Sequence, residues 1–171
     1  MSDSKLNRRL ALAGLFTALI FIFTAYVHIP TGLGYTHAGD GFIFLAASLL
    51  PLPYAIGAAA IGAASADLLT GMAIWAPATL VIKSVTVLFF GRNPGRVLTR
   101  RHYIALIPAL LINVFGYSFY EAAVMTGGSL GAAFTAAIGQ APFYTIQTLI
   151  GAAIFTMLGR FADARQLGVR L

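Results

Sequence analysis

The segment GFIFLAASLLPLPYAIGAAAIGAASA, which runs from Gly41 to Ala66, contains no charged residue. A helix that spans a bilayer needs about 20 mainly apolar residues, so this segment is longer than one span requires. The two prolines of Pro51-Leu52-Pro53 lack backbone N–H donors and disfavour a continuous helix. We therefore expect two helices here, Ala38–Leu50 and Pro53–Thr70, joined by a turn at the prolines.

Similar uncharged stretches fill most of the chain. The longest one, Ala122–Gly159, is interrupted by Thr126-Gly127-Gly128-Ser129, which are residues typical of a turn. The sequence thus predicts an all-α polytopic membrane protein with six transmembrane helices, forming a single domain over residues 1–171. The expected helices are Arg8–His28, Ala38–Leu50, Pro53–Thr70, Pro77–Phe90, Tyr103–Met125 and Leu130–Gly159, of which the second and fourth are short for a full span.

The composition excludes several classes of protein. Hydrophobic residues make up 59% of the chain and charged residues only 9%, and the mean hydropathy is +0.86. Because charged residues usually form about a quarter of a soluble domain, we do not expect a soluble enzyme, a disordered chain or a nucleic-acid-binding protein. The absence of cysteine excludes a thiolate metal site, and the histidines lack the paired spacing of metal ligands. We expect no catalytic residue, no metal site and no enzymatic activity.

The basic residues predict the orientation. Ten of the eleven lie before or in the first turn of the first expected helix, between the fourth and fifth helices, or after the sixth. With six helices, these three segments fall on one side of the bilayer, so the positive-inside rule places both termini in the cytoplasm. The ten residues are Lys5, Arg8, Arg9, Arg92, Arg96, Arg100, Arg101, Arg160, Arg165 and Arg170.

Four charged residues remain in or near the membrane: Asp40, Asp67, Lys83 and Glu121. Such residues are costly in a bilayer and usually mark a pathway or a partner. The Lys83 ammonium group, about two turns below the outer end of its helix, needs a carboxylate or several carbonyl groups. It either forms a structural ion pair with Asp67 or Asp40, or donates a hydrogen bond to a ligand in an outward-facing cavity; the two roles are compatible.

Polar and aromatic residues recur at helical spacing on the last two expected helices. Carboxamide and phenol groups are poor lipid-facing groups, so both stripes should face the bundle interior. They then either hydrogen-bond between helices or meet at the outer side to line a small-molecule pocket. The stripes consist of Asn113, Tyr117, Tyr120 and Glu121 on one helix and of Gln140, Tyr144, Gln147 and Gly151 on the other.

Two outer segments add candidates for this pocket. The loop from Thr31 to Asp40 contains Tyr35 and His37 and could cover the pocket as a lid. Trp75 either stacks on a flat ligand ring or anchors the chain at the bilayer interface, where tryptophan is common.

Small residues recur four apart on the first expected helix, as Gly14 with Ala18 and as Ala13 with Thr17. Such faces let two helix backbones approach closely. They therefore indicate a tight helix–helix contact.

Three runs of the sequence resemble a known family: Gly39–Pro51, Ala55–Leu69 and Trp75–Lys83. They are similar to the second, third and fourth helices of substrate-binding (S) components of energy-coupling factor (ECF) vitamin transporters. The nearest members are the riboflavin-type S components, a group that includes hydroxymethylpyrimidine and vitamin B6 carriers.

The resemblance implies a division of labour in a bacterial or archaeal cell membrane. An S component captures a small vitamin from outside, while a transmembrane T component and two ATPase subunits drive uptake. This chain would then bind no cofactor, with ATP hydrolysed by the partner subunits, in agreement with the absence of a G-x-x-x-x-G-K-[ST] motif. The alternatives are a self-contained secondary transporter or channel for a small heterocyclic solute, and a membrane assembly protein without a ligand.

The resemblance also implies site residues. The family pocket lies at the outer ends of helices four to six, beneath the loop that follows helix one, whereas Asp40 and Asp67 occupy motif positions for which we expect structural roles. The T component docks on an Ala-xxx-Ala motif of helix one, which here is degenerate: Ala13, Gly14, Thr17 and Ala18. The residues expected to contact substrate are Tyr35, His37, Trp75, Lys83, Asn113, Tyr117, Glu121, Gln140 and Tyr144.

This set of side chains suits a small neutral or weakly basic heterocycle that carries hydroxyl groups. Hydroxymethylpyrimidine and pyridoxine both fit that description. Because Lys83 is the only basic residue available, a phosphorylated ligand is disfavoured.

Overall fold

The computed structural model describes residues 3–31, 35–92, 95–125, 127 and 129–166. Arg170 and the turn residues Thr126 and Gly128, which entered the predictions above, lie outside the described residues.

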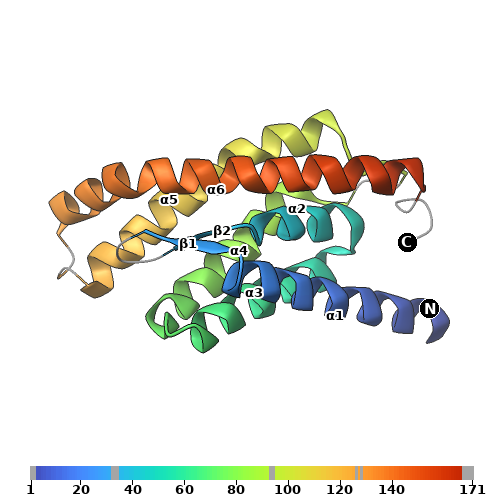
Figure 1. Cartoon of the computed structure of the whole chain (residues 1–171), viewed down its shortest axis with the longest axis horizontal. Coiled ribbons are helices and arrows are strands. Elements are labelled where there is room, and N and C mark those ends of the chain that lie inside the picture. The colour runs from blue at the N-terminus through green and yellow to red at the C-terminus, as the bar shows by residue number, and fades with distance from the viewer. Residues whose placement is uncertain (1–2, 32–34, 93–94, 126, 128, 167–171) are drawn as a thin grey trace.

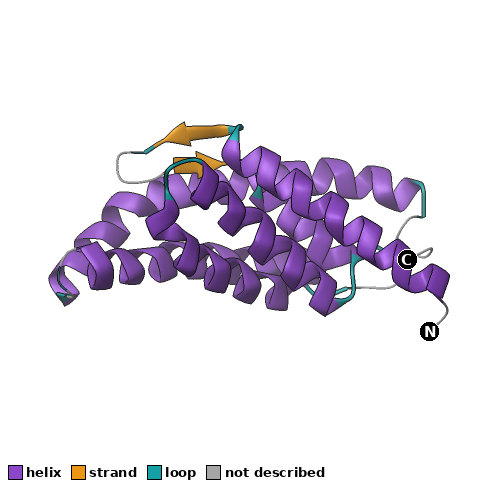
Figure 2. Ribbon diagram, turned by 90° about the horizontal axis from the view of Figure 1, so that it is seen from below, coloured by secondary structure: helices purple, strands orange, loops and turns teal. Residues whose placement is uncertain are grey.

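Six α-helices and one short β-hairpin make up the described part of the chain (Figure 1). The beginning of α1 and the end of α6 lie at one end of the bundle, and the hairpin lies toward the other end (Figures 1 and 2). The elements are α1 (Asp3–Ala25), β1 (His28–Pro30), β2 (Tyr35–His37), α2 (Asp40–Leu49), α3 (Leu52–Leu69), the 3-10 turn η1 (Ala73–Trp75), α4 (Ala76–Phe90), α5 (Arg100–Met125) and α6 (Leu130–Ala164).

Local sequence explains where the helices begin and end. Helix α2 stops before Pro51, because a residue that precedes proline is disfavoured in a helix, and α3 then begins with Pro53 in its first turn. Helix α4 ends at Phe90 and is followed by Gly91, whose φ of +63° suits glycine. Helix α6 begins after Ser129, whose side chain accepts a hydrogen bond from the backbone N–H of Ala132 at 3.1 Å.

Five helical segments of the described chain are long and apolar enough to cross a membrane: α1, α3, η1 with α4, α5 and α6. Large apolar side chains such as Phe115, Phe119 and Leu149 are exposed on the outside of the bundle, as contact with lipid requires. The chain is therefore an all-α, multi-pass membrane protein. Helix α2 has 10 residues and is only about 15 Å long, half the thickness of a bilayer core.

The structure departs from the sequence predictions at the hairpin and at the bounds of three helices, of which α5 begins at Arg100 instead of Tyr103. Residues His28–Pro30 and Tyr35–His37 pair as antiparallel strands, where we expected the end of the first helix at His28 and a loop from Thr31 to Asp40. Helix α1 begins at Asp3 instead of Arg8 and ends at Ala25, because the chain then turns into the hairpin. Helix α6 continues to Ala164, five residues beyond the expected end at Gly159, since a helix can extend past the apolar segment that spans the bilayer.

Helix α2 forms the centre of the bundle. Every residue from Asp40 to Leu49 is buried, and the helix contacts α1, α3, α4 and α6. The Phe44 ring stacks on Phe90 with centroids 4.6 Å apart and meets the edge of Phe155 at 6.4 Å. The core therefore surrounds a helix that is shorter than the bilayer.

Glycine permits close packing between α1 and α3. A Cβ atom added to Gly62 of α3 would lie 2.7 Å from the Thr17 carbonyl oxygen of α1. Ala13 and Thr17 are half-buried, whereas Gly14 and Ala18 are exposed. The Ala13–Thr17 pair thus lies toward α3, and the Gly14–Ala18 pair remains open on the surface.

Two glycines of α3 provide a test of this packing. We predict that Gly62→Ala lowers the free energy of unfolding by about 1–3 kcal/mol, because the added methyl group overpacks the contact with α1. Gly57→Ala is the matched control, since nothing lies within 4 Å of its added Cβ, and alanine should stabilise the helix by up to about 1 kcal/mol. Thermal unfolding in detergent measures both, and equal effects would contradict the close contact.

Candidate functional site

A cavity lies beneath the hairpin, between α3, α4, α5 and α6. The space enclosed by its side chains is about 40 Å³, which is room for only a few water molecules. Aromatic, hydroxyl and carboxamide groups form most of its wall. The lining residues are Thr31, Tyr35, Thr36, His37, Asp67, Trp75, Thr79, Tyr117, Gln140, Phe143, Tyr144 and Gln147.

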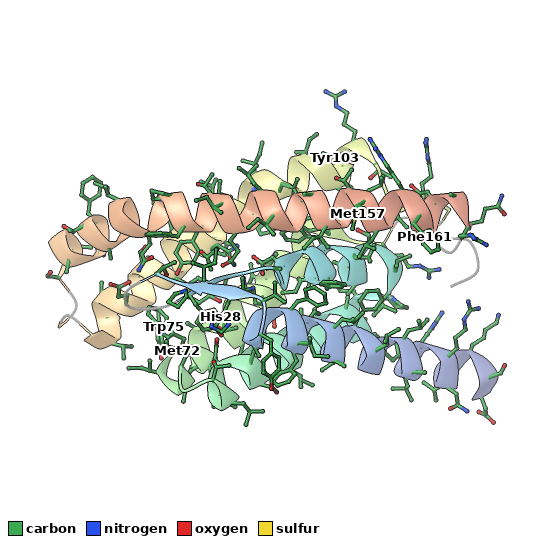
Figure 3. The ribbon with its side chains drawn as sticks, viewed as in Figure 1. His28, Met72, Trp75, Tyr103, Met157 and Phe161 are labelled. Atoms are coloured by element: carbon green, nitrogen blue, oxygen red, sulfur yellow. The ribbon has the colours of Figure 1, made fainter. Side chains whose placement is uncertain are left out.

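Three aromatic rings form one side of the cavity. The rings of Tyr117 and Tyr144 are stacked, with centroids 5.4 Å apart and an interplanar angle of 7°. Trp75 is only 6% exposed and presents its edge to Tyr117 at 5.9 Å. Figure 3 shows Trp75 and Met72 close together at the hairpin end of the bundle. Trp75 is thus part of the aromatic wall instead of lying exposed at the protein surface.

The hairpin is held over the cavity by bonds to two helices. The Tyr35 hydroxyl donates a hydrogen bond to Oδ1 of Asp67 on α3. The Thr36 hydroxyl donates to the Phe143 carbonyl at 3.1 Å, and the backbone N–H of His37 donates to Oε1 of Gln147 at 3.3 Å. The hairpin is therefore bonded to both sides of the cavity that it covers.

A buried ion pair lies below the cavity. The Nζ atom of Lys83 is 2.8 Å from Oδ1 of Asp40, and the two side chains are 0% and 1% exposed. Lys83 also donates to Oδ1 of Asn113 at 3.1 Å, while Nδ2 of Asn113 and Nε2 of Gln147 donate to Oδ2 of Asp40 at 3.3 and 2.8 Å. These four side chains, which we call the ion-pair network, join α2, α4, α5 and α6. The carboxylate partner of Lys83 is therefore Asp40 and not Asp67.

His37 is buried between the cavity and this network. Its Nδ1 atom accepts a hydrogen bond from the backbone N–H of Gly39 at 3.2 Å. Burial lowers the pKa of His37 to about 4, and the positive charges of Lys83 and His28 act in the same direction, against the opposing effect of Asp40. His37 is therefore neutral at pH 7.

Six of the residues expected to contact substrate line the cavity: Tyr35, His37, Trp75, Tyr117, Gln140 and Tyr144. The other three do not. Lys83 and Asn113 belong to the ion-pair network, and Glu121 is buried on α5 but is absent from the lining.

The structure also brings residues to the cavity that were not among the expected contacts. Asp67, for which we expected a structural role, lines the wall, as does Gln147 of the polar stripe on α6. Thr79 lies one helical turn before Lys83 and shares a hydrogen bond of 3.0 Å with the Tyr117 hydroxyl. The one signal for Gln147 was its spacing from Gln140 and Tyr144, whereas no spacing pattern marked Thr79.

Comparison with known proteins identifies a family. A family model described as ECF-type riboflavin transporter, S component, matches residues 6–162. This range includes the hairpin, the ion-pair network and every residue that lines the cavity. No curated protein matches the chain.

We predict that removing the cation of the ion-pair network strongly lowers the stability of the protein. Lys83→Met should lower the free energy of unfolding by about 3–5 kcal/mol, because it leaves the Asp40 carboxylate buried without a counter-charge. The double variant Asp40→Asn/Lys83→Met should be more stable than Lys83→Met, since the amide needs no cation. Thermal unfolding with and without ligand checks this, and a Lys83→Met protein of normal stability that has lost ligand binding would indicate a ligand contact instead.

The burial of His37 predicts a pH dependence of stability. The unfolded chain binds a proton at His37 below its ordinary pKa of 6.5, whereas the folded chain does so only near 4. The free energy of unfolding should therefore fall as the pH decreases from 6.5 toward 4, by up to about 3 kcal/mol from this residue. His37→Asn removes this contribution, so a variant with the same pH profile as the wild type would contradict it.

Proposed function

The chain belongs to the S-component family of ECF-type riboflavin transporters, and we propose from this premise that it captures a small vitamin or vitamin precursor in the cavity beneath the hairpin. Members of the family are substrate-binding membrane components of ECF transporters, which function with a T component and ATPase subunits. The family role is transport and not catalysis.

The single observation that carries the proposal is the wall of Trp75, Tyr117 and Tyr144 next to hydroxyl and carboxamide groups. Aromatic faces with a few polar groups suit a flat heterocycle that bears hydroxyls. The space of about 40 Å³ is small, so its walls must move apart for a large ligand. A single-ring ligand requires a smaller movement than the three-ring system of riboflavin. Hydroxymethylpyrimidine and pyridoxine are therefore the favoured substrates.

We further propose six membrane crossings, with both termini in the cytoplasm of a bacterial or archaeal cell and the hairpin end outward. The beginnings of α1 and α3 and the ends of α4 and α6 then all lie on the cytoplasmic side, so α2, with the hairpin at its outer end, makes the second crossing. The basic residues of the α4–α5 connection and of the end of α6 support this orientation. In this proposal, residues 1–171 form one transmembrane domain.

For docking on the T component, the exposed surface of α1 supports the pair Gly14 and Ala18. Ala13 and Thr17 lie toward α3 and are not free for a second close contact. An apolar groove of about 550 Å³ between α1, α2 and α6, which includes Leu15 and Leu158, lies beside this face. It adds apolar surface for the same partner.

Two measurements test the proposed function. Mass spectrometry of small molecules extracted from protein purified in detergent should identify a bound single-ring vitamin or precursor. Vesicles that contain this chain with its T component and ATPases should take up that compound when ATP is supplied, and vesicles with the chain alone should not. Uptake by the chain alone, driven by an ion gradient, would instead support a self-contained secondary transporter.

The docking proposal predicts that substitutions on the exposed face of α1 abolish transport and leave ligand binding unchanged. Gly14→Leu and Ala18→Leu should each abolish ATP-dependent uptake, because a large side chain prevents close approach of the T component, and ligand affinity should not change. Gly131→Leu is the matched control, since Gly131 is also exposed but lies at the hairpin end, at the beginning of α6. Loss of ligand binding in the Gly14 or Ala18 variants would argue that α1 serves the cavity.

A further inference from the structure

The apolar groove between α1, α2 and α6 lies apart from the cavity beneath the hairpin. Its volume is about 550 Å³, and eleven of its twelve lining residues are apolar, while the twelfth is Arg8. Helix α2 lies between α1 and α6 and packs against both (Figure 1). Leu15 on the α1 wall and Phe161 on the α6 wall are 54% and 58% exposed. The groove is thus a hollow on the outside of the bundle that is open to the hydrocarbon of the bilayer.

The length of the groove matches one leaflet of a bilayer. On α1 the lining extends from Arg8 to Leu19, which is about 16 Å of helix at about 1.5 Å per residue. The hydrocarbon core of a bilayer is about 30 Å thick, so one leaflet accounts for about 15 Å. Arg8 lies toward the beginning of α1 and Leu19 toward its end. In the proposed orientation, the groove therefore runs from the cytoplasmic membrane surface to about the middle of the bilayer.

The width of the groove distinguishes between possible occupants. A volume of about 550 Å³ along about 16 Å corresponds to a mean cross-section of about 35 Å². An α-helix with its side chains is about 10–12 Å across, so it needs a cross-section of about 80–110 Å². The groove is therefore too narrow for a helix of a partner protein or of a second copy of this chain. A single hydrocarbon chain is thinner and fits.

Basic residues surround the end of the groove that lies at the membrane surface. Arg8 lines this end, and Cζ of Arg165 lies 5.5 Å from the centroid of the Phe161 ring. Figure 3 shows Phe161 near the end of α6, at the same end of the bundle as the beginning of α1. Of the acidic residues described near these two helix ends, Asp163 accepts hydrogen bonds from two backbone N–H groups of the α4–α5 connection, and Asp3 is exposed. The basic residues described there are Lys5, Arg8, Arg9, Arg160 and Arg165.

We propose that the groove is a lipid site, in which one acyl chain of an anionic phospholipid such as phosphatidylglycerol lies along the groove and the phosphate group lies at Arg8 and Arg165. An apolar chain with an anion at one end matches both the lining and the charge at the mouth. Guanidinium groups bind phosphate oxygens strongly, and basic pockets between transmembrane helices on the cytoplasmic side bind anionic headgroups. The inference does not involve the cavity beneath the hairpin, so it is independent of the vitamin.

A seated lipid also changes the surface beside Gly14 and Ala18. The acyl chain fills the hollow next to this exposed face of α1, so the T component meets a continuous apolar surface instead of a groove. This consequence rests on the docking proposal, whereas lipid binding does not.

Native mass spectrometry of the full-length protein in detergent tests the headgroup, with phosphatidylglycerol and phosphatidylcholine of identical acyl chains as the two probes. Wild-type protein should bind one phosphatidylglycerol molecule about 10- to 30-fold more tightly than phosphatidylcholine, which is the effect expected of two basic residues on an anionic headgroup. Arg8→Gln/Arg165→Gln should lose most of this preference. Arg96→Gln/Arg100→Gln is the matched control, since it removes two exposed cations outside the groove and should keep the preference.

A second pair of variants tests the acyl chain. Ala11 is an exposed residue of the groove lining, so the indole ring of Ala11→Trp should occupy the space of the chain. The affinity for both lipids should then fall by about 10-fold or more. Ala153→Trp is the matched control, because Ala153 is exposed on α6 but is absent from the lining. It should bind both lipids as the wild type does.

Equal affinities of the wild type for the two lipids would overturn the inference, and so would a preference that Arg96→Gln/Arg100→Gln loses and Arg8→Gln/Arg165→Gln retains. If Ala11→Trp binds both lipids normally but no longer assembles with the T component, or loses a dimer that the wild type forms, the groove receives protein and the inference is wrong. A protein that binds lipid as described but no vitamin would support the lipid site and remove the proposed function alone.

Discussion

The ion pair between Asp40 and Lys83 is the interaction on which the rest of the molecule depends. Two charges in a bilayer-embedded core carry a large desolvation cost, which mutual attraction offsets only when further hydrogen bonds satisfy both groups. Asn113 and Gln147 supply those bonds. Because the four residues come from four different helices, they fix the register of α2 against α4, α5 and α6. Tyr117 and Tyr144 lie one helical turn from Asn113 and Gln147, so the same register places the aromatic wall.

The helices and the two polar stripes could be predicted from the sequence because both are local patterns. The break at Pro51 and Pro53, and the polar residues at helical spacing on α5 and α6, are properties of short segments, and the structure contains them at those places. The carboxylate partner of Lys83 could not be predicted from a local pattern. Asp40 and Asp67 are both carboxylates near the hairpin end of the bundle, and only the packing of α2 in its centre decides between them. Strands of three residues, such as Tyr35–His37, are too short to leave a periodic signal.

The hairpin lies over a small cavity between four helices. The side chains of Tyr35 and Thr36 and the backbone N–H of His37 bond the hairpin to α3 and α6. The bond from His37 ends on Gln147, whose amide nitrogen donates to Asp40. The hairpin is therefore coupled to the ion-pair network through one carboxamide.

The central claim is that ligand binds beneath the hairpin, against the aromatic wall and above the ion-pair network. An experimental structure of the purified protein with its co-purified vitamin tests it most directly. The account predicts density for a flat ring in contact with Trp75, Tyr117 and Tyr144, with the Asp40–Lys83 pair intact below it. Density for the vitamin in the groove between α1 and α6, with the aromatic wall unoccupied, would contradict it.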